Sequence, residues 1–254
     1  ILFNPNYAEA YNNMGNALKA FTFRKPDRSL HDIIISMLDK QTYVRPNDIA
    51  GAVISLLKSE PNFQRQLKLA NPNDLSHSPL NSILELVKFP LLLKVMKVCP
   101  LPDLDLEKLF EKIRHAILLN LPFLKEASAN LIRFQSALAL QCFTNEYIYN
   151  CTDEEKKTLR ALEKTVKNAL QNNKQPTPQV ILTLASYKAL NQYDWYKLLV
   201  VTEQIQEVHK RQVEEPIEEE KIRNYVPKLK EITASVSSEV RAQYEERPYP
   251  KWVN

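Results

Sequence analysis

Residues Tyr7 to Leu18 read YAEAYNNMGNAL, and this stretch decides the class of fold. Its large side chains, Tyr11, Met14 and Leu18, recur every three or four residues, with Gly15 beside them. That spacing places them on one face of a helix, where the missing side chain of Gly15 lets a neighbouring helix approach closely. A glycine inside a helix costs roughly 1 kcal/mol, so close packing is the better explanation for its presence.

Helical spacing continues through the rest of the chain. Proline or capping residues open most of the expected segments, and nothing alternates with period two for long enough to predict a strand. The expected segments are Leu30 to Leu38 capped by Ser29, Ile49 to Lys58 opened by Pro46, a buried helix pair in Ile83 to Val98, Leu106 to Leu119, Glu126 to Tyr149, a helix opened by Thr152 and its following acids, and Thr177 to Leu190. We therefore predict an all-α fold.

The small number of glycines excludes two kinds of nucleotide-binding loop. The chain has 254 residues, 44% of them hydrophobic and 25% charged, which suits one large or two modest soluble domains. It contains only 2 glycines, Gly15 and Gly51, against 16 prolines. Neither a dinucleotide-binding G-x-G-x-x-G turn nor a phosphate-binding G-x-x-x-x-G-K-[ST] loop can be built from glycines that far apart. We expect no classical nucleotide site.

Charge and cysteine usage favour a cytoplasmic protein. The net charge of +4 is mild and the basic residues are interspersed with acidic ones, so we expect no nucleic-acid partner. The 3 cysteines form no C-x-x-C motif, as in a reduced compartment. The most apolar stretch, Ile83 to Val98, includes three lysines and a proline, so we expect no membrane span. No signal peptide opens the chain, and its first residue, Ile1, suggests a fragment of a longer protein.

The densest polar and aromatic run, Phe134 to Tyr149, permits two interpretations. Cys142 could be a nucleophile if a histidine lay beside it, and the candidates are His31, His77, His115 and His209, none in a recognised motif. The alternative is a central packed helix with Ala137, Leu140 and Cys142 in the core, and we favour it. Glu146 is expected to be half-buried between aromatic rings, where its pKa could shift.

No metal motif stands out, and the remaining charged clusters have structural explanations. Asp103 and Asp105 are expected to cap a helix, and Glu214 to Glu220 to begin a solvated helix with its acids at the positive end of the helix dipole. The Asp194-Trp195-Tyr196 cluster is expected to anchor the core rather than bind a ligand. We therefore predict no catalytic residue and no metal ligand.

The opening stretch resembles the first helix of a tetratricopeptide repeat. An aromatic residue, an apolar residue three positions on and a glycine follow one another as in that family. The resemblance covers a single repeat, because Phe21 to Asp27 departs from the pattern where the second helix would form. We expect residues 1–25 to be the end of a repeat array whose earlier repeats lie upstream of Ile1, since a lone repeat cannot bury its own face.

Three further motifs extend the resemblance. They are QCFTNEYIY at Gln141 to Tyr149, ASYKAL at Ala185 to Leu190 and VSSEVRAQYEERPYPKWV at Val236 to Val253. Together they resemble bacterial proteins in which tetratricopeptide repeats precede an α-helical middle region and a class I S-adenosylmethionine-dependent methyltransferase domain. The family's terminal motif reads Q-Y-E-E-N-P-Y-P-R-W, and this chain carries Arg247 in place of the Asn and Lys251 in place of the Arg.

This resemblance implies a non-catalytic accessory region. Residues 26–234 would be the helical middle region, with hinges near 71–78 and 100–103, and residues 235–254 a helix and an extended connector to a methyltransferase domain. S-adenosylmethionine would bind the parent protein rather than this chain, and a protein or peptide partner would bind the repeats. An interaction scaffold with no enzymatic activity is the alternative.

The connector supplies the candidate docking residues. Residues that precede proline favour extended geometry, so Arg247 and Tyr249 are expected to lie in a straight arm. Tyr244, Tyr249 and Trp252 are aromatic residues on that arm and would need an apolar partner. We expect these three to dock on the methyltransferase domain and to line the mouth of its cleft.

Overall fold

A computed structural model describes residues 7–40, 44–69, 79–123, 128–223 and 225 of the protein. Within these ranges the chain is helical with no strand, which confirms the predicted all-α class. The α-helices are α1 (Ala8–Leu18), α2 (Ser29–Asp39), α3 (Pro46–Ser59), α4 (Pro61–Leu69), α5 (Pro79–Leu86), α6 (Pro90–Val98), α7 (Leu104–Asn120), α8 (Ala129–Thr144), α9 (Asp153–Gln171), α10 (Pro178–Ala185), α11 (Glu203–His209) and α12 (Glu215–Arg223).

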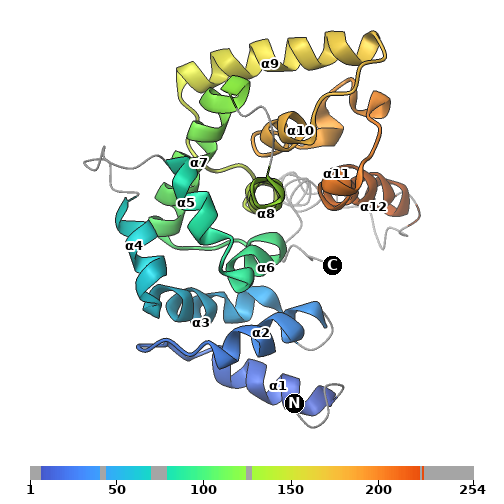
Figure 1. Cartoon of the computed structure of the whole chain (residues 1–254). Coiled ribbons are helices and arrows are strands. Elements are labelled where there is room, and N and C mark those ends of the chain that lie inside the picture. Colours follow the sequence, from blue (N-terminus) through green and yellow to red (C-terminus); the bar gives the residue numbers. More distant parts are fainter. Residues whose placement is uncertain (1–6, 41–43, 70–78, 124–127, 224, 226–254) are drawn as a thin grey trace, which may run out of the picture.

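Helix α8 lies at the centre of the molecule. Figure 1 views it end-on, with α6 on one side and α10 and α11 on the other, and these three helices pack against it. Helices α1 to α3 form a layer at one end, and α9 runs along the opposite end. The chain therefore builds outward from a middle helix that both halves of the sequence cover.

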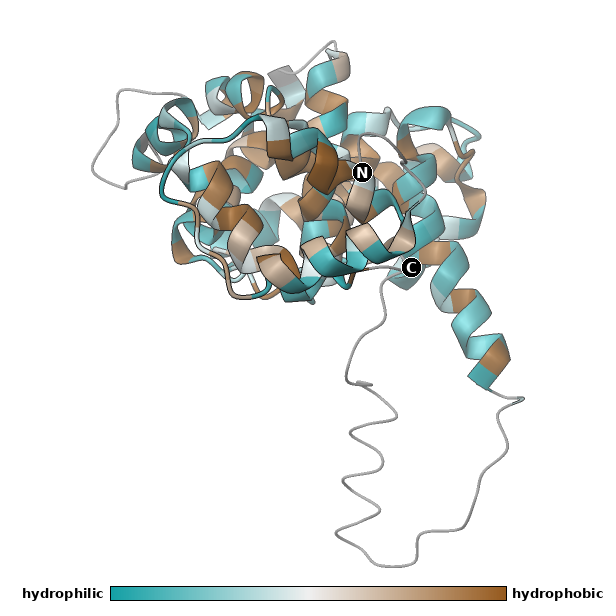
Figure 2. Ribbon diagram, turned by 90° about the horizontal axis from the view of Figure 1, so that it is seen from below, coloured by the Kyte–Doolittle hydropathy of each residue, from teal (hydrophilic) through white to brown (hydrophobic). Residues whose placement is uncertain are grey.

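Two hydrophobic cores share α8. Phe134, Ala137 and Leu138 face the larger core, which is built from α1 to α8. Ala139 and Leu140 face the smaller core, which is built from α8 to α11 and the turns between them. Hydrophobic residues gather inside the helical layers in Figure 2, and hydrophilic residues cover their outer surfaces. Because both faces of α8 are apolar, it is buried almost all round.

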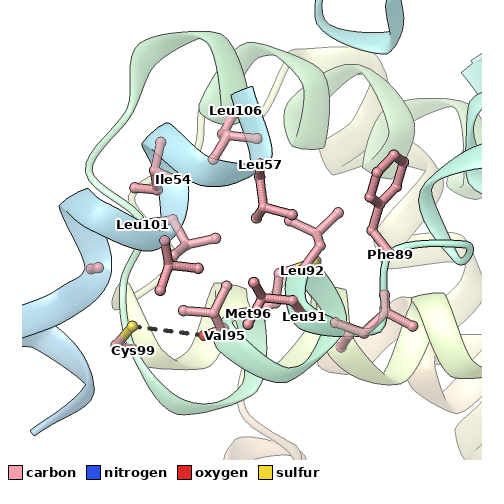
Figure 3. Packing of buried hydrophobic residues seen from close by; sticks show 14 of the residues in the cluster. Ile54, Leu57, Phe89, Leu91, Leu92, Val95, Met96, Cys99, Leu101 and Leu106 are labelled. Atoms are coloured by element: carbon pink, nitrogen blue, oxygen red, sulfur yellow. Dashed lines mark hydrogen bonds between the residues drawn. The ribbon is translucent and has the colours of Figure 1, made fainter. Parts of the chain in front are cut away.

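Helix α6 fills the middle of the larger core. Figure 3 shows its side chains between α3 and the start of α7. The residues that meet there include Ile54, Leu57, Leu91, Leu92, Val95, Met96, Leu101 and Leu106. The apolar Ile83 to Val98 stretch is thus a buried helix pair, α5 and α6, as predicted. Among the described residues no helix is long and apolar enough to cross a membrane.

Several predicted helix starts are confirmed. Thr152 and Glu155 form a reciprocal capping box at the start of α9. The side chain of Asp103 accepts hydrogen bonds from the backbone N–H groups of Asp105 and Leu106 at the start of α7. Pro46 and Pro178 occupy first-turn positions of α3 and α10, where the missing N–H of proline has no consequence. These local signals were readable from the sequence.

The first helix packs differently from the prediction. Its face of Tyr11, Gly15 and Leu18 is buried. The neighbour that approaches Gly15 is not a helix but Val44, since a Cβ atom on Gly15 would lie 2.4 Å from a methyl group of Val44. Among the described residues, the contacts to this face include Val44, Ser36 and helix α3, which all follow α1 in the chain. The upstream repeat array stays a prediction.

Two helices end earlier than predicted. Helix α8 stops at Thr144 rather than continuing to Tyr149, because Glu146 and Tyr147 both adopt left-handed backbone angles, each with φ of 59°. Helix α10 stops at Ala185 rather than at Leu190. The carbonyl of Ala185 accepts hydrogen bonds from side chains of other elements instead of continuing the helical ladder. Tertiary contacts therefore set both ends.

Two predicted helix starts are wrong. Ser29 does not cap α2, because the N-cap residue is Arg28 and the Ser29 hydroxyl donates to the Asp27 carboxylate. The acidic Glu214 to Glu220 stretch does not begin a helix either. It continues α11 through a π-helical turn, Lys210–Glu214, into α12. Residues 71–78 and the connector residues Tyr244, Tyr249 and Trp252 lie outside the described part of the chain.

Candidate functional site: the polar junction around Arg114

Two of the sequence motifs meet at one buried residue. Segments 141–150 and 185–190 are far apart in sequence, yet the side chain of Arg114 on α7 reaches backbone carbonyls in both. We call this set of contacts the polar junction and define it by Arg114, Glu155 and Tyr187 with segments 145–151 and 185–186. It lies where the C-terminal ends of α8 and α10 approach α7 and the start of α9.

Arg114 is held almost entirely by the backbone. It is 2% exposed, and its guanidinium donates to the carbonyls of Asn150 at 2.6 Å, Tyr149 at 3.4 Å and Ser186 at 3.4 Å. The guanidinium carbon also lies 4.1 Å from the centre of the Tyr187 ring. A planar cation with several donors can satisfy carbonyls from different segments at once, which a lysine could not do in the same geometry. Arg114 thus ties α7 to two chain turns.

Glu155 supplies the opposite charge from the start of α9. Its carboxylate accepts from the Tyr187 hydroxyl at 2.6 Å and from the Thr152 backbone N–H at 2.7 Å, and His115 Nδ1 lies 3.6 Å away. Burial acts to raise the pKa of Glu155, but the hydrogen bonds from Tyr187 and Thr152, with the charge of Arg114, outweigh it and lower the pKa. The ring of Tyr187 therefore stands between a buried cation and a buried anion.

The left-handed turn after α8 completes the junction. The backbone N–H of Tyr147 donates to the carbonyl of Cys142 at 2.8 Å, and its hydroxyl donates to the carbonyl of Ala185 at 3.3 Å. Burial raises the pKa of the Tyr147 and Tyr149 hydroxyls well above the usual range. Ile148, between these two tyrosines, is 68% exposed. Left-handed geometry at two consecutive residues that are not glycine is costly, and the surrounding bonds enforce it.

Cys142 lies in the core, as the interpretation of a central packed helix predicted. It is fully buried with Ala137 and Leu140, and burial raises the pKa of its thiol to about 12 even though Arg114 acts to lower it. A thiol with that pKa stays protonated near neutral pH and is a poor nucleophile.

The histidines are paired elsewhere. His31 lies against Glu60, His115 against Glu155 and His209 against Glu214, while His77 falls outside the described residues. The structure therefore does not bring a described histidine together with Cys142 as a catalytic pair.

The structure confirms some of the remaining sequence predictions and contradicts others. Trp195 is buried and stacks on Tyr193 with ring centres 4.6 Å apart, which confirms the predicted core anchor. Asp103 caps α7 and also binds Lys58, whereas the Asp105 side chain binds Lys58 without capping the helix, so the predicted cap is confirmed for Asp103 only. Glu146 is exposed rather than half-buried, because the left-handed turn directs it outward. That expectation was wrong.

The residues that matter most here were missed in the sequence. Arg114 follows Ile113 and lies four positions after Phe110, so it falls on the apolar face of α7, and a charge on an apolar face was the available signal. Gln212 is a similar case. Its fully buried amide donates to the carbonyls of Ala139 and Ala185 and accepts from the N–H of Leu190.

The charged groups of the polar junction connect helix ends. The two terminal nitrogens of the Arg114 guanidinium donate to backbone carbonyls, while its Nε has no hydrogen-bond partner, and the Glu155 carboxylate accepts from a hydroxyl and a backbone N–H. These contacts hold helix ends together. Over the described ranges there is no group of three or more His, Cys, Asp or Glu side chains arranged to hold a metal ion. The chain matches no protein-family profile, no curated protein and no solved structure.

Proposed function

We propose that this chain is a non-catalytic helical region that positions a partner or substrate for a class I S-adenosylmethionine-dependent methyltransferase domain downstream of it. The observation that supports the non-catalytic part is the use made of Arg114, Glu155 and Cys142. Arg114 and Glu155 join helix ends, and Cys142 carries a buried, protonated thiol. A region whose charged groups are used in this way suits a rigid spacer.

The methyltransferase part of the proposal rests on the resemblance of segments 141–149, 185–190 and 236–253. Two of these segments meet at the polar junction, which gives them a physical reason to occur together in one chain. In the proposed protein the repeats would hold the partner, and Tyr244, Tyr249 and Trp252 would dock on the catalytic domain. S-adenosylmethionine would bind in that domain.

Calorimetry with S-adenosylmethionine tests this proposal. We expect no heat of binding from residues 1–254 alone and clear binding from a longer chain extended to the end of its reading frame. Methyl transfer should follow the same division. Cofactor binding by the 254-residue chain, or none by the extended chain, would overturn the proposal.

A purely scaffolding protein is the second candidate, and exposed aromatic residues in the first layer favour it. Phe21 is 52% exposed and packs edge-on against Phe23 with ring centres 4.7 Å apart, beside the exposed Arg24 and Lys25. Such a loop could contact a protein partner. The coding sequence after Asn254 separates the two candidates, because a hydrophobic strand followed by a glycine-rich turn supports the methyltransferase and a stop codon supports the scaffold.

A further inference from the structure

An extended, apolar segment is exposed beside α11. Residues 198–201, which we call the edge segment, lie in the orange link that enters α11 at the outside of the molecule in Figure 1. Leu199 and the following Thr202 both have extended backbone angles. Three side chains of the segment are exposed, by 49% for Leu198, 61% for Val200 and 40% for Val201. An exposed apolar chain in strand geometry favours pairing with another chain.

One edge of this segment is already paired. The side-chain amide of Gln175 donates to the carbonyl of Leu198 at 3.0 Å and accepts from the backbone N–H of Val200 at 3.1 Å. A neighbouring β-strand would bind the same two groups, since alternate residues of an extended chain direct their backbone groups to one edge. Gln175 therefore covers this edge and holds the segment in strand geometry.

The opposite edge carries backbone groups that are free to bind. It is formed by Leu199 and Val201, and the N–H of Leu199 is used within the preceding turn, where it donates to the carbonyl of Tyr196 at 3.3 Å. Within the described ranges, the carbonyl of Leu199 and the N–H of Val201 have no hydrogen-bond partner. Such groups on an edge bind a further strand through main-chain hydrogen bonds. The edge segment thus offers one acceptor and one donor, two residues apart.

We propose that the edge segment pairs with the same segment of a second copy of this chain, as two antiparallel strands centred on Val200. The N–H of Val201 then donates to the carbonyl of Leu199 of the second copy, and the symmetric bond forms in the other direction. Because the contact is two-fold symmetric, one surface supplies both the donor and the acceptor that it needs. The two Val200 side chains meet at the symmetry axis without burying a charge. Such a dimer is independent of the proposed methyltransferase function.

Charged residues at the two ends of the edge segment favour this register and this occupant. Lys197 and Glu203 are both exposed, and within the described ranges neither forms an ion pair. Each lies three positions from Val200, so antiparallel pairing about Val200 brings Lys197 of each copy opposite Glu203 of the other. Opposite charges across paired strands are favourable. A register centred on Val201 would also permit two hydrogen bonds, but it would place Lys197 opposite Ile205. The charges therefore match a second copy of the same segment.

Sedimentation equilibrium of the 254-residue chain, from about 10 μM to about 1 mM, tests this pairing. The paired segment is short, so we expect a dimer that forms reversibly as the concentration rises. Lys197→Glu or Glu203→Lys alone places like charges opposite each other at both ends, and each should raise the Kd about ten-fold. The double variant restores opposite charges in the same register, so its Kd should return to within about three-fold of the original.

Two more variants complete the test. Val200→Lys places two like charges at the symmetry axis and should raise the Kd by at least about ten-fold. Lys157→Glu is the matched control, because it changes the net charge equally on the exposed side of α9 and should leave the Kd unchanged. A monomer at every concentration would refute the pairing and indicate a segment of another protein as the occupant. A dimer that the single charge reversals do not weaken, or that the double variant does not restore, would refute it as well.

Discussion

Glu60 and Glu155 are both buried carboxylates at helix ends, yet their surroundings differ. Glu155 accepts hydrogen bonds from Tyr187 and Thr152, and the charge of Arg114 stabilises it further. Glu60 has only the long bonds from an exposed arginine and an unsatisfied contact with His31. A buried charge with its hydrogen bonds made stiffens a structure, whereas a buried charge with few hydrogen bonds costs free energy. The two carboxylates therefore differ in how far hydrogen bonds offset the cost of their burial.

The direction of each pKa shift separates the two responses. The pKa of His31 is lowered, so its contribution to stability is present above the unfolded value of about 6.5 and is lost as the pH falls below it. The pKa of Glu155 is also lowered, but for a carboxyl group the contribution is present above about 4.3 and is lost at more acidic pH. As the pH falls, the contribution of His31 should thus be lost before that of Glu155.

Removal of Arg114 should have the largest effect on this comparison. Arg114→Ala deprives three backbone carbonyls of their donor and leaves a cavity beneath Tyr187, so we expect a loss of about 3–5 kcal/mol in the free energy of unfolding. Urea denaturation measures it. Arg133 is exposed on α8, and Arg133→Ala should cost less than about 0.5 kcal/mol. Equal losses in both variants would show that the polar junction does not contribute specially to the free energy of unfolding.

Substitution of Glu155 should have the next largest effect. Glu155→Gln keeps the shape but weakens the capping box and the bond from Tyr187, with an expected loss of about 2 kcal/mol at pH 7. The loss should shrink as the pH falls below about 4.3, because the carboxyl group of the unfolded chain then takes up a proton, and the native group follows at its lower pKa. Chemical denaturation at pH 7 and pH 4 measures both values. Glu154→Gln, on the exposed side of the same turn, is the control and should be near neutral.

The two glycines give a smaller and opposite pair of effects. Gly15→Ala would place a methyl group 2.4 Å from Val44, so we expect a loss of about 1–2 kcal/mol as the first layer shifts. Nothing lies within 4 Å of a Cβ atom at Gly51 on α3, so Gly51→Ala should stabilise the protein by roughly 0.5–1 kcal/mol. Thermal unfolding of both variants provides the measurement. A stabilised Gly15→Ala variant would show that Val44 is free to move.

The sharpest sequence predictions were local ones. The cap by Thr152 with its following acids, the Asp103 cap and the proline-led starts of α3 and α10 depend on residues a few positions apart, so short-range contacts decide them. Helix ends were harder. The ends of α8 and α10 depend on Arg114, Tyr147 and Gln212, whose partners are 27 or more residues away in sequence.

The sequence by itself determined that the chain is helical, where many of its helices begin and that its few glycines cannot form a classical phosphate-binding loop. These properties follow from side-chain periodicity and from bonds between near neighbours. Only the tertiary structure decided which charges are buried together. Arg114 and Glu155 lie on different helices, and His31 on α2 faces Glu60 at the corner between α3 and α4. Burial strengthens the interaction within each pair because it removes the water that would otherwise screen the charges.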